Sequence, residues 1–369
     1  MKEPIGIGVV GAGAIGIRAA LSHLSQPDVQ DRVRLAAVCD PVPGRAAEAA
    51  KKYGVAAHYE TYEELLGDPN VEAVTLCSPI GLHYAQGMAA IAAGKHVHFN
   101  KTITTRVDEA DRLIARAKEK GMRIVASPGQ MLFPHNRRIR KRILEGALGR
   151  LSWAITGTSA GSGTYHLNEE FRTGNDILTT VDPSWYFQRP GGGPQYDVTV
   201  YCLHNLTGIL GPARRVTAMS GIALPQREYR GRKITCDMDD STFLLLDFGE
   251  TVVAFVFASV AGQIGSGFQP NIYGTQAAII GTSLGSEDLK RPDEFPPHVV
   301  GPHKTLREFH VFEDMMQLAD WIRNGTPSIA SAEHARHVID IIESGYRAAE
   351  TGQAQELRTT FDPLSLEAL

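Results

Sequence analysis

Cysteine is scarce in this chain, and long apolar runs are absent. The four cysteines among its 369 residues lie far apart and form no CxxC pair, which excludes a disulfide scaffold and a zinc ribbon. We expect them to be reduced and mostly buried. No stretch approaches the ~18 apolar residues of a membrane span, and the N-terminus carries no signal-peptide pattern. These absences predict a soluble, cytoplasmic protein with no membrane partner.

An excess of positive charge is missing too. The formal net charge is −4 at pH 7, so no general attraction draws the chain to nucleic acid. The basic run at 135–142 is an exception, but Ile139 in it and Ile143 just after it are four residues apart and share one helical face. That run predicts a solvated helix face or a subunit contact. An HExxH motif and close Cys/His clusters are also absent, and we expect no metal site.

What the chain does contain is a glycine-rich turn directly after an apolar strand. Residues 5–10 are typical of a buried parallel strand, and glycines follow in the GxGxxG spacing. The first glycine permits a tight turn, the second lets backbone approach a pyrophosphate, and the third lets the next helix lie close to the strand. Free N–H groups at the start of that helix bind phosphates. The predicted dinucleotide contacts here are Gly11, Gly13, Ala14, Ile15 and Gly16.

An acid follows at the position expected of a ribose ligand. The predicted strand 33–39 is followed by Asp40, 24 residues after Gly16 (40 − 16) and close to the ~20 expected of such an acid. A carboxylate there accepts hydrogen bonds from both ribose hydroxyls and repels a 2′-phosphate, so Asp40 favours NAD over NADP. Two alternatives stay open. Asp40 precedes Pro41 and also fits an ordinary turn, and Arg45 is near enough in the sequence to support NADP.

The pattern of elements changes near residue 128. Before it, short apolar strands alternate with helical segments, which predicts a doubly wound parallel sheet. After it, longer strands are typical of an open, largely antiparallel sheet. We therefore predict an α/β protein with a Rossmann domain at 1–128 and a second α/β domain at 129–369 for substrate binding and oligomerisation.

Individual elements follow from the same pattern. The segments 158–190 and 283–305 are rich in Gly, Pro and polar residues and predict loops over a site or an interface. The expected helices are residues 45–52, 62–66, 83–93, 107–120 and 136–145, and the expected later strands are 73–77, 96–99, 123–126, 243–248 and 251–259.

Three further blocks carry a family resemblance. Ser-Pro-Ile-Gly-Leu-His lies at 78–83, Ala-Gly-Lys-His-Val-His-Phe-Asn-Lys-Thr at 93–102, and Gly-Gly-Gly-Pro-Gln-Tyr-Asp-Val-Thr-Val-Tyr-Cys-Leu-His at 191–204. Together they resemble the glucose-fructose oxidoreductase/inositol dehydrogenase/rhizopine catabolism (Gfo/Idh/MocA) family. The resemblance implies a nicotinamide-binding Rossmann domain, a substrate between the two domains, and oligomers formed through the open sheet. By motif position it identifies Lys101 as the catalytic lysine and Asp197 as the aspartate of the second domain.

The chain departs from the family pattern at two places. Asn100 and Thr102 replace the Glu and Pro of the family's Glu-Lys-Pro. The X-Pro bond that the family often holds cis is therefore absent, and we expect the local backbone to be set differently. Tyr201 replaces the usual histidine of the second block, and His204 lies where an acid or asparagine is common.

The spacing of Asp197, Tyr201 and His204 suggests one polar face. If Asp197 opens a helix after the glycines, all three project from the same side and line a cleft. A lysine beside the reacting hydroxyl stabilises alkoxide character and relays a proton. We expect Lys101, with Tyr201 or His204, to contact that hydroxyl, and Asp197 to orient a neighbour or bind another hydroxyl. Which residue accepts the proton stays open, as does a purely structural role for Tyr201 or His204.

Other candidates complete the predicted site. His83 either lies near the nicotinamide or faces the domain seam, and several polar residues of the second domain, His166 among them, have no placement from the sequence. The predicted catalytic residues are Lys101, Asp197, Tyr201 and His204; further cofactor contacts are Ser78, Pro79, His83, Asn100 and Lys101; substrate contacts are Lys101, Gln130, Trp185, Asp197, Tyr201 and His204.

These residues predict an NAD(P)-dependent oxidoreductase that transfers a hydride between nicotinamide and a hydroxyl-bearing carbon of a sugar, inositol or glycoside. NAD is the expected cofactor, with NADP open, and a homo-oligomer is expected. Two alternatives remain. A redox-neutral enzyme would hold NAD tightly, oxidise a sugar carbon transiently and return the hydride. A non-catalytic dinucleotide sensor is the other, although the retained Lys101 disfavours it.

Overall fold

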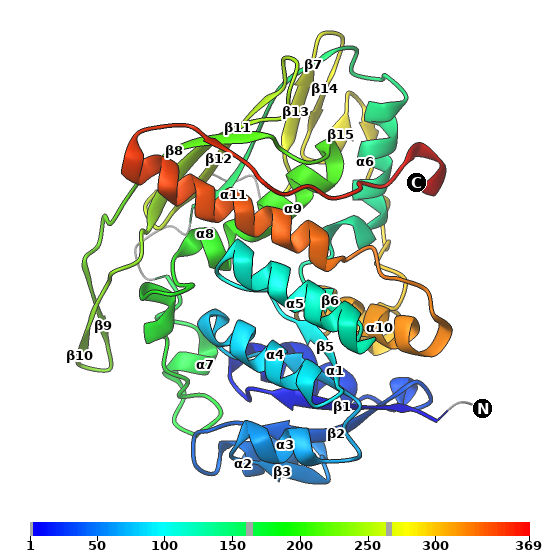
Figure 1. Ribbon diagram of the computed structural model, residues 1–369, viewed down its shortest axis with the longest axis vertical. Helices are drawn as coiled ribbons and strands as arrows, with labels where there is room; N and C mark the ends of the chain where they lie inside the picture. Colours follow the sequence, from blue (N-terminus) through cyan, green and yellow to red (C-terminus); the bar gives the residue numbers. More distant parts are fainter. Residues whose placement is uncertain (1–2, 160–164, 263–267) are drawn as a thin grey trace.

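The chain folds around two β-sheets. The computed structural model describes residues 3–159, 165–262 and 268–369. A 6-stranded sheet formed before residue 127 lies at the bottom of the molecule in Figure 1, and a 9-stranded sheet formed after residue 150 lies at the top. This arrangement confirms the predicted α/β class.

The first sheet has the doubly wound dinucleotide-binding order. Its strands run β3-β2-β1-β4-β5-β6, all parallel. Every residue of β1 is buried, as expected of a parallel strand covered on both faces. One strand, β3, was not predicted because it is short and only partly buried. The elements are β1 (Ile5–Val10), β2 (Val33–Cys39), β3 (Ala57–Tyr59), β4 (Ala73–Leu76), β5 (His96–Phe99), β6 (Ile124–Ala126), α1 (Ser22–Leu24), α2 (Arg45–Tyr53), α3 (Tyr62–Gly67), α4 (His83–Ala92) and α5 (Val107–Lys120).

The second sheet is mixed and mostly antiparallel, as predicted. Its order is β16-β15-β14-β13-β7-β12-β11-β8-β17, and only β7 and β12 pair in parallel among the described strands. Strands β9 and β10 form a separate hairpin. The strands are β7 (Leu151–Ser159), β8 (Arg215–Gly221), β9 (Gln226–Tyr229), β10 (Arg232–Thr235), β11 (Ser241–Asp247), β12 (Val253–Ser259), β13 (Asn271–Gly274), β14 (Ala278–Ile280), β15 (Ser283–Leu284), β16 (Glu287–Asp288) and β17 (Gln355–Glu356).

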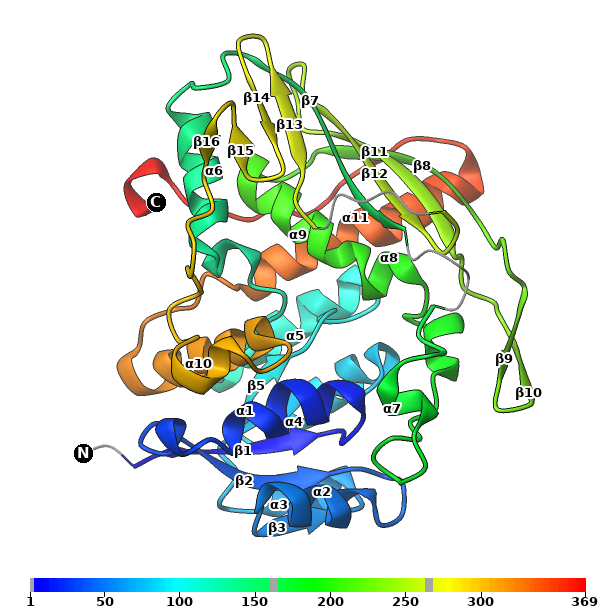
Figure 2. The same cartoon turned by 180° about the vertical axis from the view of Figure 1, so that it is seen from behind.

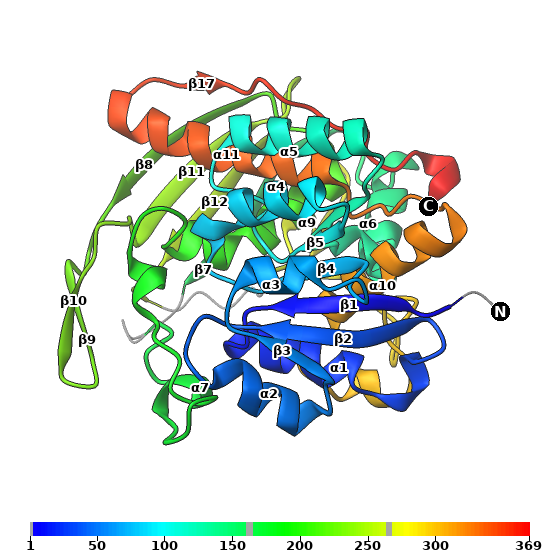
Figure 3. The same ribbon diagram turned by 60° about the horizontal axis from the view of Figure 1, so that its bottom comes forward.

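Helices of the second half cover one face of this sheet and meet the first domain. Helix α11 packs on β8 and lies beside α5, where the two sheets' layers come together (Figure 3). Helix α5 presents apolar residues at helical spacing and ends at Gly121, which adopts φ 68. The helices are α6 (Pro134–Leu144), α7 (Glu170–Thr173), α8 (Pro194–Asp197), α9 (Thr199–Leu210), α10 (Phe309–Asn324) and α11 (Ala332–Thr351).

The opposite face of the second sheet is open and apolar. In β11, Leu244 and Leu246 are buried, whereas Phe243 and Leu245 are exposed. Met219, which pairs with Phe243 on β8, is 79% exposed. Exposed Trp153 on β7 extends the same apolar surface. The alternation along each strand therefore places one apolar row in the core and leaves the other uncovered.

Two segments of the second half return to the first sheet. Helix α10 packs against α1, β5 and β6, and Phe171 and Leu178 join the apolar cluster of β1. Figure 2 shows α10 next to α1, and the loop after α7 reaching the first domain. The core of the first domain thus includes residues far beyond 128, and the predicted division at that residue stays a prediction.

The loop predictions need correction. Segment 283–305 contains the short strands β15 and β16, and segment 158–190 contains α7 and a 3₁₀ turn at Ser184–Phe187; residues 160–164 lie outside the described part. Brief elements like these carry too little periodicity to be recognised. Among the described residues, no helix combines the length and apolar character that a membrane crossing requires.

Candidate active site

The glycine turn after β1 fits a pyrophosphate. Gly11 adopts φ +98, and a Cβ there would lie 2.9 Å from the Cys77 carbonyl oxygen. A Cβ at Gly16 would overlap the carbonyl oxygen of Gly11. Gly13 differs, because a Cβ added there would have Val181 Cγ1 as its nearest neighbour, at 3.5 Å, which is an ordinary contact. The chain itself requires glycine at positions 11 and 16, whereas at Gly13 it leaves room for a small side chain.

Asp40 lies at the carboxyl end of β2 beside this turn. Its Oδ2 accepts a hydrogen bond from the Ala12 N–H (2.9 Å) and its Oδ1 accepts one from the Val42 N–H (3.0 Å). Arg45 Nη1 lies 3.4 Å from the same Oδ1, and both side chains are largely buried. The two residues expected to choose between NAD and NADP therefore form one ion pair.

Lys101 follows β5 and points to the second domain. Its Nζ donates to both Oδ1 and the backbone oxygen of Asp197, and its side chain is 10% exposed. Asn100 Oδ1 accepts from the Lys101 N–H at 2.8 Å. The Lys101–Thr102 peptide bond is cis although residue 102 is not proline. Our expectation that the backbone is set differently here was therefore wrong.

His83 links the residue after this lysine to the loop after β4. Its Nδ1 lies 2.7 Å from the Thr102 carbonyl oxygen and its Nε2 lies 3.1 Å from that of Ser78. Burial lowers the pKa of the imidazole, which favours its neutral form. Since both ring nitrogens face the chain, neither is directed to a ligand. Ser78 Oγ donates to Gln86, and Pro79 precedes a 3₁₀ turn at Ile80–Leu82.

Asp197 ends α8 and does not open α9, contrary to our expectation. Helix α9 begins at Thr199, after a break at Val198. Lys101 Nζ donates to Oδ1 of the Asp197 carboxylate. Its Oδ2 accepts hydrogen bonds from His166 Nε2 (2.5 Å) and from the Tyr165 hydroxyl (2.6 Å). Burial disfavours its charge, but Lys101 and His166 hold the pKa of Asp197 well below its usual range.

Of the three residues predicted to share a cleft, Asp197 and Tyr201 both lie beside Lys101, whereas His204 does not. The ring of Tyr201 lies 5.4 Å from Lys101 Nζ, and its hydroxyl lies 3.0 Å from His310 Nε2. His204 instead packs on His334, with ring centroids 4.6 Å apart, and burial lowers its pKa to about 3. Within the described residues, no hydrogen bond or ring contact joins His204 to Lys101, Asp197 or Tyr201. Its position suits a structural histidine.

The two remaining predicted substrate contacts, Gln130 and Trp185, have other neighbours. Gln130 is buried in a 3₁₀ turn, where its carbonyl oxygen accepts from Asn136 at 2.7 Å. Trp185 stacks on Tyr186 at 3.9 Å, and Tyr186 stacks on His166 at 4.0 Å. Among the described ring contacts, Tyr186 therefore connects Trp185 to His166.

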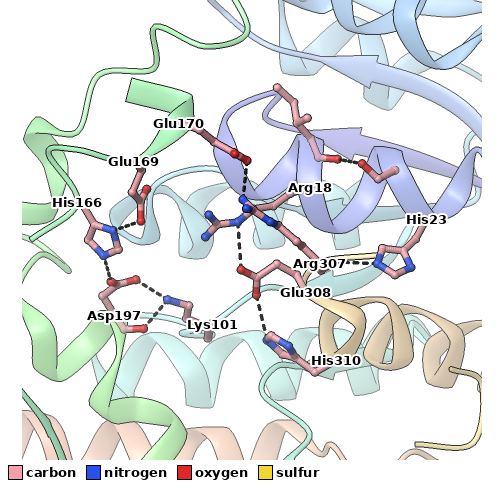
Figure 4. A network of polar contacts seen from close by, with 12 residues as sticks. Arg18, His23, Lys101, His166, Glu169, Glu170, Asp197, Arg307, Glu308 and His310 are labelled. Atoms are coloured by element: carbon pink, nitrogen blue, oxygen red, sulfur yellow. Dashed lines mark hydrogen bonds and ion pairs between the residues drawn. The ribbon is translucent and has the colours of Figure 1, made fainter. Parts of the chain in front are cut away.

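Several polar residues that the sequence did not place join Asp197 around Lys101. Figure 4 shows Asp197, His166 and Glu169 on one side of it and Arg18, Glu308 and His310 on the other. Arg18 Nε lies 3.0 Å from Glu308 Oε1, and Glu308 Oε2 lies 3.5 Å from His310 Nε2. Arg18 follows the glycine turn by two residues, whereas Glu308 and His310 come from the start of α10 and had no local signal. No group of three or more His, Cys, Asp or Glu side chains in the described part is arranged to hold a metal ion.

Comparison with known proteins identifies relatives over nearly the whole chain. The chain is 25% identical to scyllo-inositol 2-dehydrogenase (NADP(+)) IolW of Bacillus subtilis over an alignment of 378 residues, which covers 94% of each chain. Identity to D-glucoside 3-dehydrogenase of Escherichia coli is 23% over 373 residues, covering 96% of this chain and 98% of that one. An uncharacterized oxidoreductase of Synechocystis is 27% identical over 252 residues, which cover 67% of this chain and 63% of that protein.

Solved structures and family models agree with these relatives. Levoglucosan dehydrogenase in complex with NADH and L-sorbose has a TM-score of 0.75 at 19% identity, covering 97% of this chain and 100% of that one. The model described as oxidoreductase family, NAD-binding Rossmann fold, matches residues 5–127, and the GFO/IDH/MocA C-terminal domain model matches residues 136–280. The chain therefore belongs to the Gfo/Idh/MocA family of oxidoreductases.

Proposed function

We propose that this protein is an NAD-dependent dehydrogenase acting on a secondary hydroxyl of a sugar, inositol or glycoside. The observation that carries this proposal is the Lys101–Asp197 pair, held beside the carboxyl ends of the Rossmann strands by residues of both domains. Substrates of doubly wound proteins bind at this edge of the sheet. The names of the inositol and glucoside dehydrogenases among the relatives support the same substrate class.

The residues have distinct roles in this proposal. The glycine turn with Ala14, Ile15 and Asp40 holds NAD, and the backbone near Ser78, Pro79 and Asn100 borders the nicotinamide. Bound NAD supplies the hydride acceptor. Lys101 Nζ binds the reacting hydroxyl and takes its proton as the carbonyl forms. Tyr201, joined to His310, and the Arg18–Glu308 pair offer hydrogen bonds to further hydroxyls, which suits a polyol.

Cofactor choice gives a first prediction. Replacing Asp40 by asparagine removes the charge that repels a 2′-phosphate and frees the Arg45 guanidinium from its carboxylate. We expect the ratio of the Kd values for NADP and NAD to fall by about tenfold, the equivalent of ~1.4 kcal/mol. Titration calorimetry with each cofactor measures this ratio. The matched control is Asp68→Asn, a turn acid of the same domain that contacts Asn70 and Tyr59; a similar change in that variant would contradict the assignment.

A second candidate function is the redox-neutral enzyme that retains its cofactor. One observation favours it: the segment after α7 lies over the glycine turn. The Ile177 carbonyl oxygen accepts from Arg45 Nε at 3.2 Å, and Val181 lies against Gly13. Phe171 and Leu178 anchor this segment in the apolar core of the first domain. A covered cofactor dissociates slowly, which is what a returned hydride requires.

One experiment separates these functions. Purified protein is mixed with NAD or NADP and a panel of free sugars, inositols and aryl glycosides, and absorbance of reduced nicotinamide is followed. Sustained formation supports the dehydrogenase and names its substrate class. Reduction limited to protein-bound cofactor supports the redox-neutral enzyme. If NAD binds but no substrate gives either sustained or protein-bound reduction of nicotinamide, both enzymatic proposals are overturned. The non-catalytic dinucleotide sensor is then the function that remains.

The open sheet face suggests how copies of the chain associate. Its exposed apolar residues, Met219, Phe243 and Leu245, form a surface of the kind buried in homodimers. We expect Leu245→Glu to convert a homo-oligomer into monomers, as measured by light scattering. Lys118→Glu, on the exposed face of α5, is the control and should leave the mass unchanged. An oligomer that survives a charge at both Met219 and Leu245 must use another surface.

A further inference from the structure

His166 connects the Lys101–Asp197 pair to a second carboxylate. Its Nε2 lies 2.5 Å from Asp197 Oδ2 and its Nδ1 lies 2.6 Å from Glu169 Oε1. Two carboxylates facing both ring nitrogens are satisfied only by an imidazole that is protonated at both. Figure 4 shows the resulting row of alternating charge, Lys101, Asp197, His166 and Glu169.

The surroundings of His166 favour its charged form. Burial opposes the charge, but Asp197 and Glu169 outweigh it and raise the pKa of His166. The other groups near it are Tyr165 and Tyr186, whose pKa values burial raises so that both stay neutral. Beyond Glu169 lie two further cations, Arg172 and Arg18, which help to hold the pKa of Glu169 below its usual value against its burial.

The backbone at His166 also points to a site. His166 adopts φ 57, in the left-handed region that non-glycine residues seldom occupy. Such a conformation costs on the order of 1 kcal/mol or more and is found where the surrounding structure requires it. The His166 ring, which contacts Asp197, stacks on Tyr186 and lies at a tilt against Tyr165.

We propose that His166 is a positioning residue that allows Lys101 to act as a base, because it shares the Asp197 carboxylate with that lysine. In alcohol oxidation the electron pair of the C–H bond leaves as hydride to NAD, and the hydroxyl proton goes to the free amine of Lys101. The amine must therefore lose a proton first. In a simple buried Lys–Asp pair that loss would leave an unpaired carboxylate, which is costly. With a cationic His166 present, Asp197 stays paired and the second positive charge repels the proton on Lys101.

This inference rests on the proposed function for its purpose, but its first test needs no substrate. Competitive labelling with acetic anhydride, read by mass spectrometry, measures how fast Lys101 reacts at each pH and therefore when it loses its proton. We expect the midpoint for Lys101 to move upward by about one pH unit or more in His166→Gln, a tenfold change in the free amine at a fixed pH. His166→Lys retains a cation and should move the midpoint back toward that of the unaltered protein.

The second test uses turnover. In His166→Gln the rate of oxidation should fall about tenfold near neutral pH and recover at high pH, because the free amine returns there. Glu169→Gln should give a smaller shift in the same direction, and serves if His166→Gln fails to fold. The control is His298→Gln, since His298 also lies between two carboxylates, Glu313 and Asp320, both at 2.9 Å, away from Lys101.

The outcomes separate this inference from the proposed function. A loss of rate that is equal at every pH, or an unmoved labelling midpoint in a folded His166→Gln, overturns the role of His166 even if the protein oxidises a sugar. A shifted labelling midpoint in a protein that oxidises no substrate supports the charge sharing and contradicts the dehydrogenase. A midpoint that moves equally in His298→Gln also overturns the inference.

Discussion

Replacing Lys101 by alanine should lower kcat for alcohol oxidation by about 10²- to 10⁴-fold, the usual contribution of a positioned acid or base. The Nζ of Lys101 is the lysine amine that contacts Asp197 among the described ion pairs, so alanine leaves this carboxylate without an amine partner there. Binding of NAD should persist, because the glycine turn and Asp40 belong to other loops. Stopped-flow or steady-state absorbance measures kcat, and fluorescence titration measures the Kd for NAD.

Lys101→Arg tests what the lysine does. Arginine retains the positive charge and a hydrogen bond to Asp197, but it does not release a proton near neutral pH. If Lys101 accepts the hydroxyl proton, the arginine variant should be nearly as slow as the alanine variant. If Lys101 only supplies a charge, the arginine variant should retain much of the activity. An alanine variant with undiminished kcat would remove Lys101 from the reaction altogether.

The first domain was predictable because its signals are local. The strand, the glycine turn and the acid after β2 lie within one short stretch, and each glycine has a steric reason that the sequence alone suggests. The structure supplies those reasons at Gly11 and Gly16, where a side chain would meet backbone oxygen. Helix α5 was found with its observed bounds because its buried residues repeat at helical spacing and a glycine ends it.

The prediction that Asp197, Tyr201 and His204 share one face of a helix was wrong for a physical reason. Spacing along a helix predicts a common face only if the helix is continuous, and here Val198 separates Asp197, at the end of α8, from α9. The sequence at this point does not predict the break, since Val198 is neither glycine nor proline. The consequence is that Asp197 joins Lys101 while His204 joins the buried histidine at 334.

The remainder of the site depends on contacts between distant segments. Arg18, His166 and Glu308 come from three regions of the chain, and only the return of α10 and the 165–173 segment to the first domain brings them together. Their own neighbours in the sequence show no pattern that distinguishes them from surface residues. Such a site is found from the structure, or from a resemblance, but not from local spacing.

Gly13→Ala should weaken NAD binding by about 100-fold, or ~2.7 kcal/mol, in a protein as stable as the original. The glycine has no positive φ, and an added Cβ would meet only Val181 Cγ1 at 3.5 Å. Alanine at such a position even stabilises a fold by about 0.4–1 kcal/mol, because the unfolded chain loses freedom. The same methyl group would occupy the approach to the turn that a pyrophosphate needs. Calorimetry of NAD binding and chemical unfolding are measured on the same preparation.

Gly16→Ala supplies the contrast that makes this test decisive. Its Cβ would overlap the Gly11 carbonyl oxygen, a backbone atom directly after β1 in a residue whose N–H donates to Cys39 of β2. We expect that variant to lose about 3 kcal/mol of unfolding free energy, and it therefore loses NAD binding together with its fold. If Gly13→Ala instead binds NAD as tightly as the original protein, the pyrophosphate does not lie against this turn. If it unfolds like Gly16→Ala, the space at Gly13 serves the fold and not a ligand.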